Sequence, residues 1–222
     1  MNRAILLSGG RGLRAGGEIP KQYIDMGGEM MVIRALHALT SHPGIDSVRI
    51  VAEEEWRDRI LEAAGETDKA KTEGFSAPGK NRALSILNAL NDMEDVSDED
   101  NVLIHDAARP FVSAELISGC LEGCLEHEGV MPGIPVKDTT YICENGRIKA
   151  LLDRNSLRAG QAPEAFKLRR FKKALEALLP DKILEINGSA EIAVLDGMDV
   201  AVIEGDEANI KITTAEDIRK YL

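Results

Sequence analysis

The chain has 222 residues and a formal net charge of -11, with 44% hydrophobic and 29% charged residues. This length and balance are typical of one globular domain that buries a core, and they argue against intrinsic disorder. The negative charge argues against nucleic acid and an anionic membrane surface as partners, because such binders need an excess of Lys and Arg.

The first apolar run, Ala4–Leu7, is too short for the core of a signal peptide. No apolar run approaches the roughly 20 residues that a membrane span needs. We therefore expect a cytoplasmic protein with no membrane partner.

Short apolar runs alternate with helical patterns along the chain. The runs predict strands over Ala4–Leu7, Val48–Val51, Val102–His105, Val130–Ile134 and Val200–Ile203. The helical patterns cover Met30–Thr40, Glu54–Ala64, Arg82–Leu90, Ala114–His127, Leu168–Leu178 and Ala215–Tyr221. Strands without a polar face predict an α/β fold, with a Rossmann-like, mostly parallel sheet covered by helices on both faces. Ligands bind such sheets at the carboxyl ends of the strands, so the residues after each strand are candidate site residues.

A different pattern occupies residues 136–160. Thr139–Cys143 and Ile148–Leu152 flank the turn Glu144–Gly146, as in a β-hairpin. Because a two-stranded ribbon alone is marginally stable, we expect this arm to project and pack against another subunit. The rest of residues 1–222 is expected to form one domain.

A glycine-rich, basic loop follows the first predicted strand, and its sequence is Ser8-Gly9-Gly10-Arg11-Gly12-Leu13-Arg14-Ala15-Gly16-Gly17. Glycines allow backbone N–H groups to close around phosphate oxygens. Arg11, Arg14 and Lys21 add three cations in an acidic chain, so the loop predicts a polyphosphate site.

Two other nucleotide-binding motifs do not fit this loop. Gly10-x-Gly12-x-x-Ala15 matches the dinucleotide fingerprint, which requires a helix to begin inside the motif and an acidic residue about 20 positions on. Further glycines and Pro20 exclude a continuous helix, and the carboxylate after the second strand, Glu53, comes too late. A Walker loop is excluded because no Gly-Lys-Ser/Thr follows the glycines.

An acidic residue follows the third predicted strand, in His105-Asp106-Ala107-Ala108-Arg109-Pro110. A carboxylate at a strand end is suited to Mg²⁺, which bridges phosphate oxygens during displacement at phosphorus. Arg109 is a candidate contact to a second anion.

Six motifs in order give the chain a family resemblance. They are Pro20-Lys21-Gln22-Tyr23, the segment 79–85 (Gly-Lys-Asn-Arg-Ala-Leu-Ser), the Asp106 motif, Pro135-Val136-Lys137-Asp138-Thr139, Asp153-Arg154-Asn155-x-Leu157 and Asn209-Ile210-Lys211-Ile212-Thr213. Together they resemble the 2-C-methyl-D-erythritol 4-phosphate cytidylyltransferases, whose close relatives, the ribitol-5-phosphate cytidylyltransferases, share most of these motifs. The resemblance covers nearly the whole chain and implies a nucleotide-diphospho-sugar transferase-like fold.

The resemblance implies a reaction in which CTP and a polyol phosphate give a CDP-polyol and pyrophosphate, with Mg²⁺ or another divalent cation. It implies that the loop Ser8, Gly9, Gly10, Arg11 and Gly12 binds the triphosphate, and that Gly79, Arg82 and Ser85 fix the cytidine. Asp106 is the implied metal ligand. The implied catalytic cations are Arg14, Lys21 and Lys211.

The resemblance also implies contacts to the polyol phosphate from Arg109, Thr139 and Arg154. The arginine that matches Arg154 is supplied by the partner subunit's arm in the family, so a homodimer with arm exchange is implied.

The motifs leave two alternatives for the acceptor: methylerythritol phosphate, or ribitol phosphate or another sugar-alcohol phosphate. Gly9-Gly10 and the segment 160–164 (Gly-Gln-Ala-Pro-Glu) are closer to the ribitol-phosphate relatives, whereas the motifs around Thr139 and Arg154 favour methylerythritol phosphate. A non-catalytic nucleotide-binding protein on the same fold is the alternative of another class.

Overall fold

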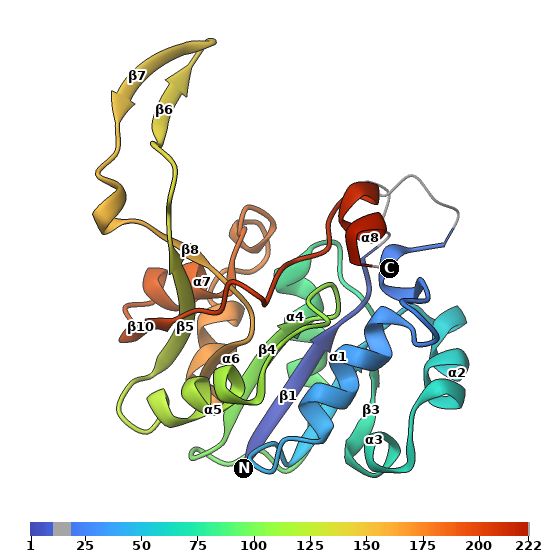
Figure 1. The fold of residues 1–222 in the computed structure, drawn as a ribbon. Helices are drawn as coiled ribbons and strands as arrows, with labels where there is room; N and C mark the ends of the chain where they lie inside the picture. Colours follow the sequence, from blue (N-terminus) through green and yellow to red (C-terminus); the bar gives the residue numbers. More distant parts are fainter. Residues whose placement is uncertain (11–18, 222) are drawn as a thin grey trace.

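The computed structural model describes residues 1–10 and 19–221. Their main feature is an eight-stranded sheet with the order β10-β5-β9-β4-β1-β2-β3, in which β8 also pairs with β5 (Figure 1). The strands are β1 (Asn2–Leu7), β2 (Ser47–Val51), β3 (Thr72–Ser76), β4 (Asn101–Asp106), β5 (Gly129–Pro135), β8 (Arg158–Gly160), β9 (Glu164–Lys167) and β10 (Val200–Glu204).

The sheet is mixed but mostly parallel. β1 is parallel to β2 and β4, β2 to β3, and β5 to β10. β9 lies antiparallel between β4 and β5, so these two strands point the same way. The carboxyl ends of all five predicted strands therefore face one edge of the sheet, which confirms the predicted α/β fold and its topology.

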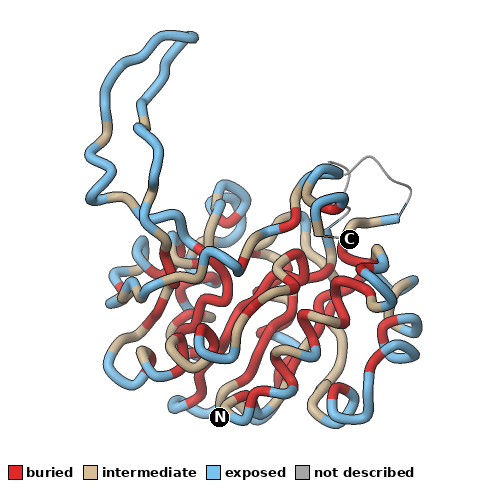
Figure 2. Tube along the Cα trace, in the orientation of Figure 1, coloured by how far each residue is buried: buried red, intermediate tan, exposed pale blue. Residues whose placement is uncertain are grey.

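Helices cover both faces of this sheet. They are α1 (Met31–Thr40), α2 (Glu54–Ala63), α3 (Glu66–Lys71), α4 (Arg82–Asn91), α5 (Ala114–Gly123), α6 (Leu168–Glu176), α7 (Ser189–Leu195) and α8 (Ala215–Tyr221). One core cluster joins α1 and α5 to the sheet, and a second joins α4, α6 and α7 to it. Figure 2 shows this buried interior running through the strands. None of the helices in the described ranges has the length and apolar character needed to traverse a bilayer.

The predicted hairpin is present and projects away from the sheet (Figures 1 and 2). Its strands, β6 (Tyr141–Glu144) and β7 (Arg147–Leu151), pair only with each other among the described strands. Asn145 and Gly146 form the turn with φ of 50° and 73°, the left-handed conformation that a tight hairpin turn requires. Every residue of the two strands is exposed, including large apolar side chains.

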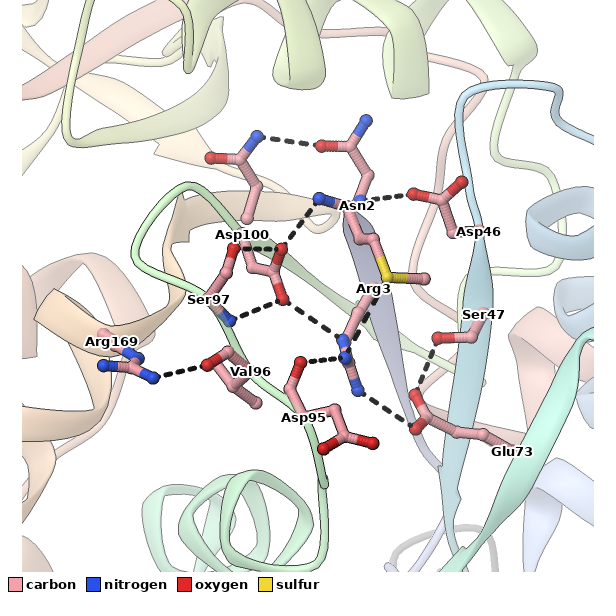
Figure 3. Close-up of polar contacts among 12 residues, drawn as sticks. Asn2, Arg3, Asp46, Ser47, Glu73, Asp95, Val96, Ser97, Asp100 and Arg169 are labelled. Carbon is pink, nitrogen blue, oxygen red and sulfur yellow. Dashed lines mark hydrogen bonds and ion pairs between the residues drawn. The ribbon is translucent and has the colours of Figure 1, made fainter.

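A buried polar network lies at the opposite edge of the sheet, where β1 and β4 begin (Figure 3). The guanidinium of Arg3 lies 3.5 Å from carboxylate oxygens of both Glu73 and Asp100, and it donates to the carbonyl of Asp95 at 3.0 Å. Arg3 and Asp100 are almost completely buried. Because ligands of such sheets bind at the other edge, this network is structural.

Candidate active site

A cavity of about 890 Å³ opens at the carboxyl ends of β1, β2 and β4. Its volume suits a nucleotide-sized ligand. The sequence-predicted residues that line it are Ser8, Gly9, Gly10, Lys21, Gly79, Arg82, Ser85, Asp106 and Lys211. The structure thus brings together residues from four distant parts of the chain.

Two glycines allow close backbone packing at the mouth of this cavity. A Cβ atom on Gly9 would lie 2.5 Å from the Pro78 side chain, and one on Gly79 would lie 2.6 Å from the main chain of Leu84. The N–H group of Gly79 donates to Ser85 Oγ at 2.9 Å, and Ser85 Oγ donates to the carbonyl of Asn81. The segment 79–85 is therefore a compact turn into α4, and Ser85 holds the turn as well as lining the cavity.

Two residues after the glycine loop hold its first part in place. Gln22 Nε2 donates to the carbonyl oxygens of Ser8 and Gly10 at 2.6 and 2.5 Å. The Tyr23 hydroxyl donates to the Ser8 carbonyl at 2.9 Å, and its ring stacks on Trp56. The carbonyl oxygens of Ser8 and Gly10 therefore accept hydrogen bonds from the protein itself. Paired in this way, these carbonyl oxygens do not repel an anionic ligand.

Asp106 is the centre of charge in the cavity. Arg82 Nε lies 3.4 Å from Asp106 Oδ1, and Lys211 Nζ lies 2.7 Å from Asp106 Oδ2. Burial alone would raise the pKa of Asp106, but Arg82 and Lys211 outweigh burial and hold this pKa well below its usual range. The carboxylate is therefore ionised at neutral pH.

A second lysine reaches the cavity from the other end of the chain. Lys21 Nζ donates to the carbonyl of Ile212 at 2.5 Å, so the segment that carries Lys211 also positions Lys21. The N–H group of Ile212 in turn donates to the carbonyl of Ala108, which ties this segment to the end of β4.

Arg109 lies beside the cavity rather than in its lining. Its Nη1 donates to the carbonyl of Asn209 at 2.6 Å, and its buried Nε has no hydrogen-bond partner among the described residues. Burial lowers the pKa of Arg109, and the nearby charge of Arg82 lowers it further. The Arg109 carbonyl accepts a hydrogen bond from His105 Nε2 at 3.0 Å, so His105 supports the strand end.

Thr139 and Arg154 do not line this cavity. Both are exposed, at the base of the projecting hairpin. Arg154 donates to the carbonyl of Lys137 at 3.0 Å. Within one chain, the structure does not bring these two residues to Lys21 and Asp106. Arg11, Gly12 and Arg14 lie outside the described residues.

Asp106 is the one sequence-predicted metal ligand in the cavity. No group of three His, Cys, Asp or Glu side chains with metal-site geometry occurs in residues 1–10 and 19–221. Mg²⁺ in nucleotide enzymes commonly takes one or two carboxylates, with phosphate oxygens and water as its other ligands. Asp106 alone therefore fits an ion that arrives with a triphosphate.

Sequence reasoning missed two residues that hold Arg82. Arg82 Nη2 lies 3.1 Å from Glu164 Oε2, and Arg82 Nη1 donates to Ser189 Oγ. Glu164 begins a strand that the sequence pattern did not predict, and Ser189 begins a helix that it did not predict. The only available signal for Glu164 was its place between the apolar residues Pro163 and Ala165, and the polar sequence around Ser189 gave no signal.

The chain matches known proteins over almost its full length. A family model for 2-C-methyl-D-erythritol 4-phosphate cytidylyltransferase matches residues 3–220. The enzyme of that name from Rubrobacter xylanophilus is 35% identical over 219 residues, which cover 97% of this chain and 90% of the relative. The bifunctional enzyme IspD/IspF of Bradyrhizobium sp. strain BTAi1 is 38% identical over 215 residues, covering 96% of this chain and 54% of the relative.

The chain thus spans about half the length of its bifunctional relatives. Among solved structures, 4-diphosphocytidyl-2C-methyl-D-erythritol synthase from Anaerococcus prevotii superposes with a TM-score of 0.84 at 24% identity. That match covers 99% of this chain and 95% of the other, and it supports the same fold. On the family match and the identities above, the chain belongs to the 2-C-methyl-D-erythritol 4-phosphate cytidylyltransferase family.

Proposed function

We propose that the protein transfers the cytidylyl group of CTP to 2-C-methyl-D-erythritol 4-phosphate. A phosphate oxygen of the acceptor attacks the α-phosphorus of CTP and forms the new P–O bond. The bond from the α-phosphorus to the bridging oxygen breaks, and pyrophosphate leaves with the electron pair.

The observation that carries this proposal is the gathering of Lys21, Lys211 and Arg82 around one cavity in a chain of net charge -11. An acceptor phosphate is already an anionic nucleophile, so the reaction needs positioning and charge stabilisation rather than a strong general base. Lys21 and Lys211 are suited to stabilise charge on the α-phosphate and the leaving pyrophosphate. Arg14 is the third proposed catalytic cation, and Ser8 to Gly12 the proposed triphosphate loop.

A divalent cation such as Mg²⁺ belongs to this proposal, with Asp106 as its protein ligand. When bound, the ion offsets charge that builds up on the phosphate oxygens. The side chain of Lys211 now contacts Asp106 Oδ2, and its flexible stem allows the ammonium to turn to a phosphate instead.

The acceptor site is proposed to form between two subunits. Arg109 is close to the cavity, whereas Thr139 and Arg154 lie at the base of the arm of residues 136–160. Exposed apolar side chains on both arm strands, Ile142 and Ile148 among them, support packing of the arm on a partner. We propose one domain with this dimerisation arm, and a homodimer in which Arg154 serves the partner's site.

Gly79, Arg82 and Ser85 are the proposed cytidine contacts.

Pyrophosphate release tests the function directly. The purified protein is incubated with CTP and Mg²⁺, and with either 2-C-methyl-D-erythritol 4-phosphate or ribitol 5-phosphate. Faster release with the first acceptor supports the proposal, and release with ribitol 5-phosphate alone assigns the protein to the other branch. CTP binding without release in either reaction supports the non-catalytic alternative.

A further inference from the structure

Glu164 is a buried carboxylate next to the cavity, and its two oxygens have different partners. It is the first residue of β9 and pairs with Ile104 of β4, two residues before Asp106. Glu164 Oε2 lies 3.1 Å from Arg82 Nη2, and Glu164 Oε1 accepts the N–H group of Ala190 at 3.0 Å. Its side chain is only 9% exposed and does not line the cavity. Glu164 therefore reaches the site only through the groups that it holds.

Arg82 is the group through which Glu164 reaches the cavity. The three nitrogens of its guanidinium face three partners, with Nε toward Asp106, Nη1 toward Ser189 and Nη2 toward Glu164. Because the guanidinium is planar and rigid, three partners in different directions fix its orientation. Glu164 is closer to Arg82 than Asp106 is, at 3.1 Å against 3.4 Å.

Asp106 and Glu164 both interact electrostatically with the guanidinium of Arg82. Burial alone would lower the pKa of Arg82, but Asp106 and Glu164 together raise the pKa above its ordinary value. Without Glu164, Asp106 would be the one carboxylate in contact with Arg82 among the described residues. A guanidinium and a carboxylate favour a bidentate pair, which would occupy both oxygens of Asp106.

We propose that Glu164 is a positioning residue that holds Arg82 away from a bidentate pair with Asp106. Asp106 thereby keeps Oδ2 for Lys211 and for a cation that arrives with the nucleotide, while Arg82 keeps its place in the cavity lining. The proposal rests on the proposed function only in taking CTP as the nucleotide.

The test compares CTP affinity, measured by calorimetry, with steady-state kinetics of pyrophosphate release. Glu164→Ala is expected to weaken CTP binding and to raise the KM for CTP by about tenfold or more, with a smaller effect on kcat. Glu164→Gln offers one acceptor oxygen for two donors, so its CTP affinity is expected between those of the wild type and Glu164→Ala.

Glu191 provides the matched control. Its carboxylate accepts the N–H groups of Asn187 and Gly188, so it holds the beginning of α7 as Glu164 does through Ala190, but it makes no contact with Arg82. Glu191→Ala is expected to leave the KM for CTP unchanged. An equal rise in the KM for CTP in both alanine variants would mean that Glu164 acts only by holding the beginning of α7, and it would overturn the proposal.

A double-mutant cycle identifies Arg82 as the intermediary. In an Arg82→Ala background, Glu164→Ala is expected to have little further effect on CTP affinity, because its target is absent. A full, additive effect in that background would overturn the proposal, and if Glu164→Ala does not fold, the cycle is run with Glu164→Gln. If the wild-type protein binds CTP but releases no pyrophosphate, the proposed function is wrong. The proposal for Glu164 can still be tested in that case, because it depends on the comparison of CTP affinities.

Discussion

The ammonium group of Lys21 lies 2.5 Å from the main-chain carbonyl oxygen of Ile212. This contact joins the end of the glycine-rich loop to the segment that carries Lys211, whose own ammonium group lies 2.7 Å from Asp106. Residues almost 200 positions apart in the sequence thus place two cations in one cavity. Each lysine contacts an oxygen atom that a phosphate oxygen can replace.

Replacement of Lys21 by alanine is expected to lower turnover by about a hundredfold or more, which corresponds to roughly 3 kcal/mol for one preorganised charge contact. Single-turnover pyrophosphate release at saturating CTP measures this effect. Lys69→Ala, at a surface ion pair with Glu66 on α3, is the control and is expected to retain wild-type turnover. Near-normal turnover in Lys21→Ala would remove Lys21 from the catalytic group.

The strand-end rule explains why much of the cavity was predictable. Ser8, Gly9, Gly10 and Asp106 all follow or end parallel strands with clear apolar runs, and the structure places them in one cavity. Lys21 was found with the basic glycine-rich loop, whereas Arg82 and Lys211 were found through the family resemblance, because no local pattern relates residues so far apart. For Thr139 and Arg154, the described chain offers no shared cavity, so their roles stay predictions.

Glu164 shows where the rule fails. β9 is antiparallel to β4, so the first residue of β9, rather than the residue after it, reaches the functional edge. A search restricted to residues that follow strands cannot find such a residue. The edge strand β3 was missed for another reason, since Thr72–Ser76 is only partly buried and has a single large apolar residue, Phe75. The predicted helix at Ala114–His127 was too long, because α5 ends at Gly123.

A shared active site predicts complementation between two inactive variants. In a heterodimer of Lys21→Ala and Arg154→Ala subunits, one of the two sites keeps both side chains if Arg154 acts across the dimer. Such heterodimers are expected to recover about half of the wild-type activity, since one of two symmetric sites is restored. Pyrophosphate release by differentially tagged, purified heterodimers measures the recovery. No recovery would mean that each site is built from one chain.

The buried imidazole of His105 predicts a pH dependence of stability. Burial lowers the pKa of His105 to about 4 from the ordinary 6.5, and the charges of Arg109 and Arg82 also lower it. The folded state therefore binds this proton less readily than the unfolded state. The contribution of neutral His105 to the free energy of unfolding is fully present above pH 6.5. It is lost as the pH falls toward 4, by roughly 3 kcal/mol in total.

Urea unfolding at several pH values across this window measures the effect. His105→Gln retains a donor for the Arg109 carbonyl and does not titrate, so its free energy of unfolding is expected to fall less between pH 6.5 and 4. Asp106 stays ionised throughout, because its pKa lies well below its usual range. An identical pH dependence in wild type and His105→Gln would contradict the assignment to His105.

The polar network around Arg3 predicts a loss of stability without a loss of function. The side chains of Arg3 and Asp100 are 7% and 3% exposed, so Arg3→Met leaves a buried carboxylate with fewer partners. The expected loss in the free energy of unfolding is about 3 kcal/mol, the lower end for a broken buried pair, because Asp100 keeps its hydrogen bonds from Ser97. The kcat is expected to stay unchanged, since this network lies at the edge of the sheet opposite the cavity.

Arg169 is the control within the same region (Figure 3). Its side chain is 52% exposed and pairs with Asp98 at the surface, so Arg169→Met is expected to cost less than about 1 kcal/mol. Urea unfolding of both variants, with kcat measured on the same preparations, separates the two cases. Equal losses of stability would mean that burial does not strengthen the Arg3 network. The Arg3 network makes no contact with the cavity. A lower kcat of Arg3→Met under conditions where the variant is fully folded would therefore show that this edge of the sheet is coupled to the cavity.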